Sequence, residues 1–200
     1  MNMEKKFELT DNFIINAFGV KLFQIKCTKS FKYAKEGDLG GYVEKDENLD
    51  QESDAWVSGN ARVSGDAWVS GNAEVSGDAW VAGYAEVAGN ARVTGNAWVA
   101  GNARVAGNAW VSGNARVYGY AEIDNNNRHC GFDCFGSANR HTHAYLTKEN
   151  KVEITCGCFR GSIEEFEKRV EETHSGTIYE KQYKAIIDVI KIKFGLTDLI

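Results

Sequence analysis

The chain has 200 residues and a net charge of −5, from 23 lysines and arginines against 28 aspartates and glutamates. This mild acidity argues against nucleic-acid binding through a basic face. No apolar run approaches the ~18 residues that a membrane-spanning helix needs, so we expect no membrane partner. The charged N-terminus lacks the apolar segment of a secretory signal, so we expect a cytoplasmic location and reduced thiols for the five cysteines.

Residues 1–53 are predicted to form a β cap below the central part of the chain. A strand is expected over 21–27, after a turn at Phe18 and Gly19, and the glycine-rich stretch 37–43 leads into the next segment. The segment 44–52 is acidic and does not share the spacing that follows it. A cap is needed here because the first strands of a stacked structure expose unpaired backbone groups.

Residues 54–123 form a repeat in which a glycine recurs every six positions, from Gly59 to Gly119. Each full unit holds an alanine and a valine two positions apart, so both point to the same side of an extended chain. The residue between them, a tryptophan, arginine or glutamate, points to the other side. Six residues cannot bury their own apolar face, so the units are predicted to stack as the coils of a parallel β-helix.

The charged residues of the repeat indicate how many units make one coil. A coil of three units places Glu74 beside Arg92 and Glu86 beside Arg104, and it stacks no like charges. A coil of two units would instead stack Arg92 on Arg104 and Glu74 on Glu86. Like charges directly opposite each other are destabilising, so three units per coil are predicted.

The same register stacks Trp80 on Trp98 and places Arg116 beside Trp98, which suits a cation–π contact. Outward tryptophans can simply shield backbone, but a large exposed aromatic area also marks interaction surfaces. We therefore interpret Trp80, Trp98 and Arg116 as candidate binding residues. The aromatic faces also favour a homo-oligomer.

Residues 124–200 are predicted to form a separate α+β module. Strands are expected over 143–146 and 152–156, joined as a hairpin. Ser162 and Glu165 have the spacing of a capping box, which begins a helix that ends near Gly176. A second helix is expected from about Tyr179, and the apolar stripes of both helices are expected to pack on the hairpin.

Written from its valine, the repeat resembles the hexapeptide repeat of left-handed β-helix proteins. The chain as a whole resembles a family of phage and prophage proteins, through the stretches 37–45, 136–140 and 156–166. These proteins are often labelled polymer-forming because their repeat is similar to that of bactofilins. The resemblance implies a left-handed parallel β-helix, with three hexapeptides per coil, and an accessory role in the host cytoplasm, in some cases against host defence.

The cysteines suggest one further site. Cys130, Cys134, Cys156 and Cys158 are candidate zinc ligands, although their spacings differ from the C-x2-C pairs of common zinc sites. They can equally be reduced structural thiols, and Cys156 with Cys158 can be a redox pair. We expect no cofactor, with zinc as the alternative.

The segment 136–142 offers hydroxyl, amide, guanidinium and imidazole groups, which suit a phosphate or carboxylate. An ordinary polar loop is the alternative interpretation. The candidate residues in this segment are Ser137, Asn139, Arg140 and His141.

Three functions compete. The first is a non-enzymatic, phage-encoded binding protein or inhibitor that captures a host protein or a small signalling molecule, consistent with counter-defence. The second is an acyltransferase of the hexapeptide-repeat type, for which His129 is the one plausible base. The third is a structural polymer, which material at both ends of the repeat would block. We expect the first, and no catalytic residues.

Overall fold

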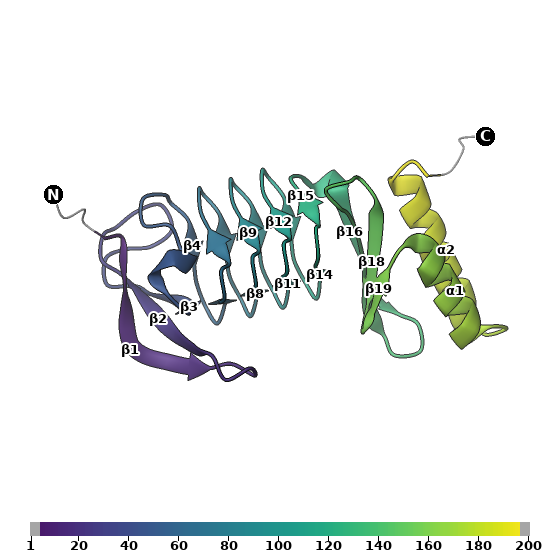
Figure 1. Ribbon diagram of the computed structural model, residues 1–200, viewed down its shortest axis with the longest axis horizontal. Coiled ribbons are helices and arrows are strands. Elements are labelled where there is room, and N and C mark those ends of the chain that lie inside the picture. Colours follow the sequence, from purple (N-terminus) through teal and green to yellow (C-terminus); the bar gives the residue numbers. More distant parts are fainter. Residues whose placement is uncertain (1–4, 197–200) are drawn as a thin grey trace.

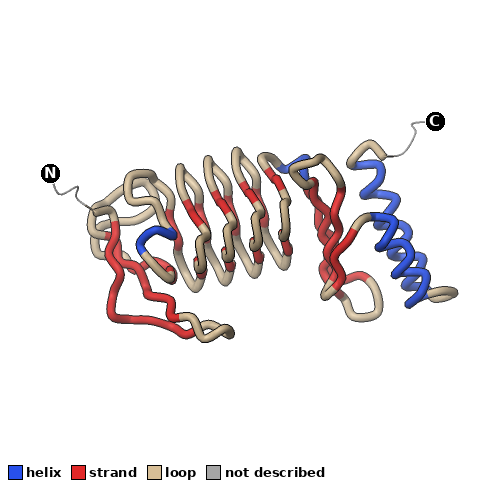
Figure 2. The backbone as a smooth tube through the Cα atoms, in the orientation of Figure 1, coloured by secondary structure: helices blue, strands red, loops and turns tan. Residues whose placement is uncertain are grey.

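The computed structural model describes residues 5–196, and its centre is a parallel β-solenoid (Figure 1). A β-hairpin lies at the N-terminal end of the solenoid, and a small sheet covered by two helices lies at the C-terminal end. Within the solenoid the strands are short and the turns between them are longer (Figure 2). None of the helices in residues 5–196 is long and apolar enough to span a membrane.

Each of the three faces of the solenoid is a ladder of parallel strands of two residues each. The first ladder contains β4 (Trp56–Val57), β7 (Glu74–Val75), β10 (Arg92–Val93) and β13 (Trp110–Val111). The second contains β5 (Arg62–Val63), β8 (Trp80–Val81), β11 (Trp98–Val99) and β14 (Arg116–Val117). The third contains β6 (Trp68–Val69), β9 (Glu86–Val87), β12 (Arg104–Val105) and β15 (Glu122–Ile123).

The register of these ladders confirms the predicted coil of three hexapeptides. Glu74 pairs with Arg92, Trp80 with Trp98, and each partner lies 18 residues along the chain. The valines of the repeat, and the alanine two positions before each of them, are buried and form one continuous core. The left hand that the resemblance implies stays a prediction.

The glycines explain why the corners can be so tight. Gly89 has a φ of +67°, and a Cβ added there would lie 2.9 Å from the backbone nitrogen of Gly107 in the next coil. Only glycine combines a positive φ with this close approach of two backbones. The repeat therefore depends on glycine for both conformation and space.

The N-terminal part contains β1 (Phe7–Ile15), β2 (Lys21–Cys27), β3 (Leu39–Val43) and the 3-10 helix η1 (Asp46–Asn48). The strand expected over 21–27 is confirmed, whereas β1 was not predicted. β3 pairs antiparallel with β2 and parallel with β5, where Tyr42 is the partner of Arg62. Parallel stacking thus begins before the regular repeat, in a coil that is two residues longer than the others.

Side chains close the lower end of the ladders. The Lys6 Nζ donates to the carbonyl oxygens of Ser53 and Ala55 at 2.7 and 2.8 Å. The Asn48 Nδ2 donates to the carbonyl oxygens of Gly65 and Ala67 at 3.0 and 2.8 Å. Lys6 and Asn48 are both buried, and burial lowers the pKa of Lys6 to about 8.

The C-terminal module has a four-stranded antiparallel sheet of β16 (His129–Phe135), β17 (Arg140–Leu146), β18 (Val152–Cys156) and β19 (Phe159–Gly161). The helices are α1 (Ile163–His174) and α2 (Ile178–Lys193), and the 3-10 helix η2 (Asn126–Arg128) precedes the sheet. The predicted hairpin, both helices and the capping box at Ser162 are confirmed. β16 and β19 were not predicted.

Candidate functional site

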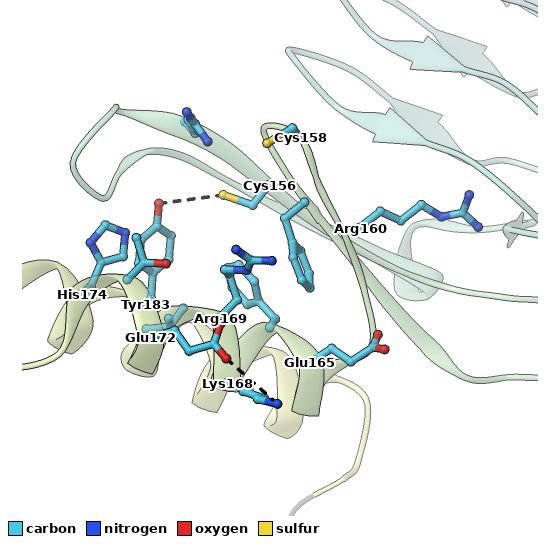
Figure 3. Close-up of a pocket in the computed structure, with 14 residues that line it drawn as sticks. Cys156, Cys158, Arg160, Glu165, Lys168, Arg169, Glu172, His174 and Tyr183 are labelled. Atoms are coloured by element: carbon cyan, nitrogen blue, oxygen red, sulfur yellow. Dashed lines mark hydrogen bonds and ion pairs between the residues drawn. The ribbon is translucent and has the colours of Figure 1, made fainter.

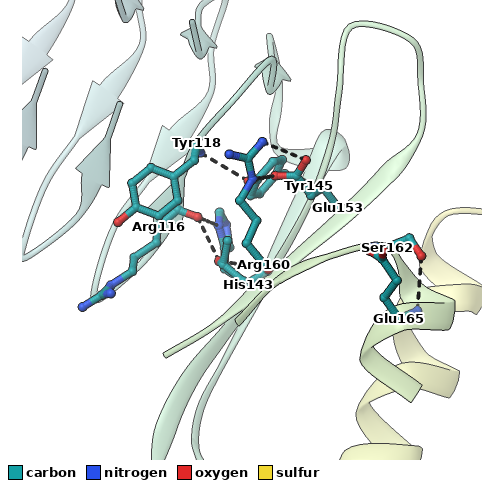
Figure 4. Close-up of polar contacts among 9 residues, drawn as sticks. Arg116, Tyr118, His143, Tyr145, Glu153, Arg160, Ser162 and Glu165 are labelled. Atoms are coloured by element: carbon teal, nitrogen blue, oxygen red, sulfur yellow. Dashed lines mark hydrogen bonds and ion pairs between the residues drawn. The ribbon is translucent and has the colours of Figure 1, made fainter. Parts of the chain in front are cut away.

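The sheet of the C-terminal module covers the last coil with one of its faces. His143 Nδ1 and Thr155 Oγ1 both lie within hydrogen-bond distance of the Arg116 carbonyl oxygen, at 3.3 and 3.0 Å (Figure 4). The backbone nitrogen of Tyr118 donates to the Tyr145 hydroxyl at 3.3 Å. These are the backbone groups of β14 that would pair with a further coil, so side chains replace that coil.

The other two ladders end in the same way. The backbone nitrogen of Trp110 donates to Asn126 Oδ1 at 2.7 Å, and Arg128 Nε donates to the Glu122 carbonyl oxygen at 2.6 Å. All three faces of the solenoid are therefore closed by polar side chains, which satisfies groups that would otherwise be buried without partners.

The histidines of this cap have defined protonation. Because His143 Nδ1 donates to a carbonyl, its Nε2 accepts, and His129 Nδ1 donates to it at 3.0 Å. Burial lowers the pKa of His129 to about 4 and that of His143 to about 3, so both rings are neutral at pH 7. His129 Nε2 is buried and has no hydrogen-bond partner within residues 5–196. This atom is shielded from solvent, which does not suit a catalytic base.

A groove lies on the opposite side of the sheet, between β18, β19 and α1 (Figure 3). Its volume is about 630 Å³. Arg140 of β17 and Arg169 of α1 line it, and Cys156 and Tyr183 contribute polar atoms from largely buried side chains. The Tyr183 hydroxyl lies 3.8 Å from the Cys156 Sγ.

Some of the charged side chains that line the groove are paired within the protein, and others are not. Arg160 is held by Glu153, with Nε to Oε1 at 2.5 Å, and Figure 3 shows it pointing away from the groove. Lys168 pairs with Glu172 at 4.0 Å. Glu165 accepts from the Ser162 backbone nitrogen at 2.8 Å.

Arg140 and Arg169 have no ion-pair partner among the described residues, 5–196. Two guanidinium groups are thus left to an outside anion, in a chain whose net charge is −5. Burial raises the pKa of Tyr183 to about 12, with a contribution from Cys156, so its hydroxyl keeps its proton and can donate to an anion.

The structure divides the candidate loop between two faces. Arg140 lines the groove, whereas the next residue, His141, points to the other face of β17, where its Nδ1 lies 2.7 Å from Asp133 Oδ1. Ser137 and Asn139 are exposed in the turn between β16 and β17, and Asn139 has a φ of +48°. The loop therefore contributes Arg140 alone to the groove.

The cysteines are free thiols that do not gather. Cys130 is half-buried, Cys134 and Cys158 are exposed, and Cys156 is buried against the helices. Within residues 5–196, no group of three or more His, Cys, Asp or Glu side chains is arranged to hold a metal ion.

The predicted tryptophan pair forms an aromatic column. The rings of Trp80 and Trp98 are stacked, with centroids 4.9 Å apart and planes at 5°. Phe18 packs on Trp80 at 5.7 Å and Tyr118 packs on Trp98 at 5.4 Å, so intramolecular contacts cover both ends of the pair. The two tryptophans are half-buried as a result.

Arg116 connects this column to the groove. Its Cζ lies 5.9 Å from the Trp98 ring centroid, and its Nη1 donates to the Gly157 carbonyl oxygen at 3.3 Å. Gly157 also lies beside the Arg140 guanidinium, since a Cβ there would be 2.7 Å from Arg140 Nη1. Two of the predicted residues, Arg116 and Arg140, thus meet at the Gly157 turn, and Arg116 also lies against Trp98. Arg169, far away in the sequence, was missed.

Comparison with known families agrees with the fold. Residues 55–71 match the family described as YdcK Beta solenoid repeat, which supports a β-solenoid repeat protein. No curated protein matches the chain.

Proposed function

We propose that this protein is a non-enzymatic binding protein whose C-terminal groove captures a small anionic molecule. The observation that carries the proposal is the pair Arg140 and Arg169, which line the groove without ion-pair partners among the described residues. Guanidinium groups bind phosphate and carboxylate strongly, because they donate two parallel hydrogen bonds. The Tyr183 hydroxyl supplies a further donor at the floor.

The size of the groove supports a ligand of nucleotide size, since sites for small molecules are typically ~300–1,000 Å³. Such a ligand is consistent with a small signalling molecule. The resemblance to phage and prophage accessory proteins supports a role as an inhibitor in the host cytoplasm that removes this molecule from a defence pathway. It also supports a left-handed coil.

Capture of a host protein through Trp80 and Trp98 is less favoured, because Phe18, Tyr118 and Arg116 already pack against that pair. Trp68 and Trp110 are better placed for a homo-oligomer, because 46% and 53% of their surfaces are exposed. The burial of His129 Nε2 argues against the acyltransferase alternative. The side chains that close both ends of the ladders argue against the polymer.

Native mass spectrometry of the protein purified from a bacterial cytoplasm is the first test, because it reports a retained ligand and the oligomeric state together. Isothermal titration calorimetry with ATP and inorganic pyrophosphate then measures anion binding directly. We expect the double variant Arg140→Ala/Arg169→Ala to bind at least tenfold more weakly than the wild type.

The matched control is Arg92→Ala/Arg104→Ala, which also removes two positive charges, from solenoid faces where Arg92 pairs with Glu74 at 3.1 Å and Arg104 pairs with Glu86 at 3.7 Å. This variant should bind as the wild type does. The proposal is wrong if the wild type binds neither anion and retains no ligand, or if the double variant binds as tightly as the control.

A further inference from the structure

Two tyrosines interrupt an otherwise uniform corner of the solenoid. The residue after each glycine of the repeat is an asparagine or aspartate at every position from 60 to 114 except Tyr84, and Tyr120 replaces it again in the last unit. Both side chains are strongly exposed, Tyr84 at 68% and Tyr120 at 61%. The fold does not bury these rings, so core packing does not explain them.

The two tyrosines lie on the same corner, with Asn102 between them. The backbone nitrogen of Tyr84 donates to the Gly101 carbonyl oxygen at 2.8 Å, and that of Asn102 donates to the Gly119 carbonyl oxygen at 2.9 Å. Tyr84 and Tyr120 are therefore two coils apart, which corresponds to ~9.6 Å at the usual spacing of neighbouring strands.

The two tyrosines interrupt a row of asparagine side chains that would otherwise hydrogen-bond to one another from coil to coil. On another corner, Asn72 Nδ2 donates to Asn90 Oδ1 at 2.9 Å, and Asn90 donates to Asn108 in the same way at 3.0 Å. Asn102, with a tyrosine above and below it, makes no side-chain hydrogen bond to any residue in the part of the chain that the structure describes. A residue that departs from the pattern of its repeat, and that adds no contact stabilising the fold, is typical of a functional site.

A shallow cavity of about 310 Å³ lies between the two rings. Its polar groups are the amide of Asn102 and the side chains of Glu86, Arg104, Glu122 and Lys148. Glu86 is occupied by Arg104 at 3.7 Å. The carboxylate of Glu122 has no ion-pair partner within residues 5–196.

We propose that this corner, which we call the tyrosine groove (Tyr84, Asn102, Tyr120 and Glu122), binds a proline-rich segment of another protein in the polyproline II conformation. That helix has three residues per turn and a rise of 3.1 Å, so equivalent prolines recur every ~9.3 Å. This period matches the ~9.6 Å between the two tyrosines. Aromatic-lined grooves are the usual receptors for such segments.

The polar groups suit the same ligand. A polyproline II backbone makes no internal hydrogen bonds, so its carbonyl oxygens are free to accept from the Asn102 amide. The Glu122 carboxylate offers an acceptor to a lysine or arginine beside the prolines, and the Lys148 amine of the same cavity offers a donor to a peptide carbonyl oxygen. The chain itself contains no proline, so the ligand has to come from a different protein.

The test uses the full chain and a fluorescent ten-residue oligoproline peptide with one arginine at its N-terminus. Fluorescence anisotropy should show saturable binding. The double variant Tyr84→Asn/Tyr120→Asn restores the residue that the repeat prefers, so it should fold at least as well as the wild type, and it should bind the peptide at least tenfold more weakly. Tyr179→Asn, which removes an exposed tyrosine from the first turn of α2, should bind as the wild type does.

A glycine-serine peptide with the same arginine should not bind, which separates polyproline recognition from simple charge attraction. Absence of oligoproline binding, or equal binding by the double variant, overturns the proposal. Binding of cellohexaose without binding of the peptide also overturns it, because it identifies the groove as a carbohydrate site. None of these results depends on Arg140 and Arg169, so this proposal and the proposed function can fail separately.

Discussion

The indole Nε1 of Trp80 donates a hydrogen bond to the Ser64 hydroxyl, 16 residues earlier, at 3.1 Å. Trp110 makes the equivalent bond to Thr94 at 3.2 Å, again across 16 residues. For Trp98 the corresponding residue is Ala82, which has no acceptor, and the Trp98 Nε1 is buried without a partner in the described chain. Trp80 and Trp110 thus each bond to a hydroxyl 16 residues earlier, and Trp98 lacks such a partner because Ala82 stands at that position.

The substitution Ala82→Ser should therefore stabilise the protein. A new hydrogen bond to a previously unpaired buried donor contributes about 1 kcal/mol to the free energy of unfolding. This corresponds to a rise of about 2–4 °C in the melting temperature. Ala88→Ser is the control, because the residue 16 positions later is Arg104 and not a tryptophan. An equal effect of both substitutions on thermal unfolding would show that Trp98 is not the cause.

Two glycines with the same backbone conformation should differ in their tolerance of alanine. Gly89 and Gly113 have φ values of +67° and +66°, but of the two only Gly89 would direct an added Cβ against the backbone of the next coil. Alanine at either position incurs the ~1–2 kcal/mol cost of a left-handed residue. Gly89→Ala adds a contact at 2.9 Å with the Gly107 nitrogen, so its urea midpoint should lie well below that of Gly113→Ala. Equal midpoints would mean that neighbouring coils move apart enough to accommodate the added methyl group at no cost in stability.

Acid should weaken the C-terminal cap. His129 and His143 have pKa values lowered to about 4 and about 3 in the folded state, against about 6.5 when exposed. Between these limits the unfolded chain binds more protons than the folded chain, so stability falls as the pH drops below 6.5. Protonated rings would also lie near each other, near His141 and near Lys193.

Urea unfolding at pH 7.5 and pH 5.0 measures this effect. The double variant His129→Asn/His143→Asn should be less stable than the wild type at pH 7.5, because it loses the cap. It should nevertheless lose less stability on acidification. A pH dependence identical to that of the wild type would place the sensitive groups elsewhere.

Removal of one hydroxyl from the cap should open the last coil locally. Tyr145 accepts from the Tyr118 backbone nitrogen and donates to Glu153 Oε1 at 2.6 Å. Tyr145→Phe leaves the Tyr118 backbone nitrogen unpaired, whereas Glu153 keeps its ion pair with Arg160, and an unpaired backbone donor costs about 1–3 kcal/mol. Hydrogen exchange at the Tyr118 amide should accelerate more than exchange at the Ala100 amide, which donates to Val117 inside the ladder. Equal acceleration would indicate global destabilisation instead.

The solenoid could be predicted because its pattern is local and repeated. The choice of 18 residues per coil depended on charge pairs such as Glu74 with Arg92, and the structure places those side chains 3.1 Å apart. The ends were harder to predict. β16 carries His129 and Asp133 on the face towards the last coil. In the sequence, a polar strand face that caps backbone groups looks the same as one that faces water, so this strand could not be identified.

The groove could be predicted only in part. Arg140 was identified from the donors around it. The apolar stripe of α1 indicates which residues pack on the sheet, but it does not indicate that Arg169 borders the groove. Lys6 shows the same limit, because nothing in the sequence near it indicates that its amine is buried against the Ala55 carbonyl. Such contacts depend on tertiary structure, which a single sequence does not specify locally.

The three-unit coil also sets the angle between the two ends of the molecule. Each hexapeptide advances the chain by one third of a turn, so the orientation of the C-terminal groove relative to the N-terminal hairpin depends on the number of units modulo three. Deleting 18 residues would shorten the solenoid by ~4.8 Å and leave that orientation unchanged. Deleting six would rotate the groove by about 120° relative to the N-terminal hairpin, so the number of repeats sets the relative direction of the two ends of the molecule.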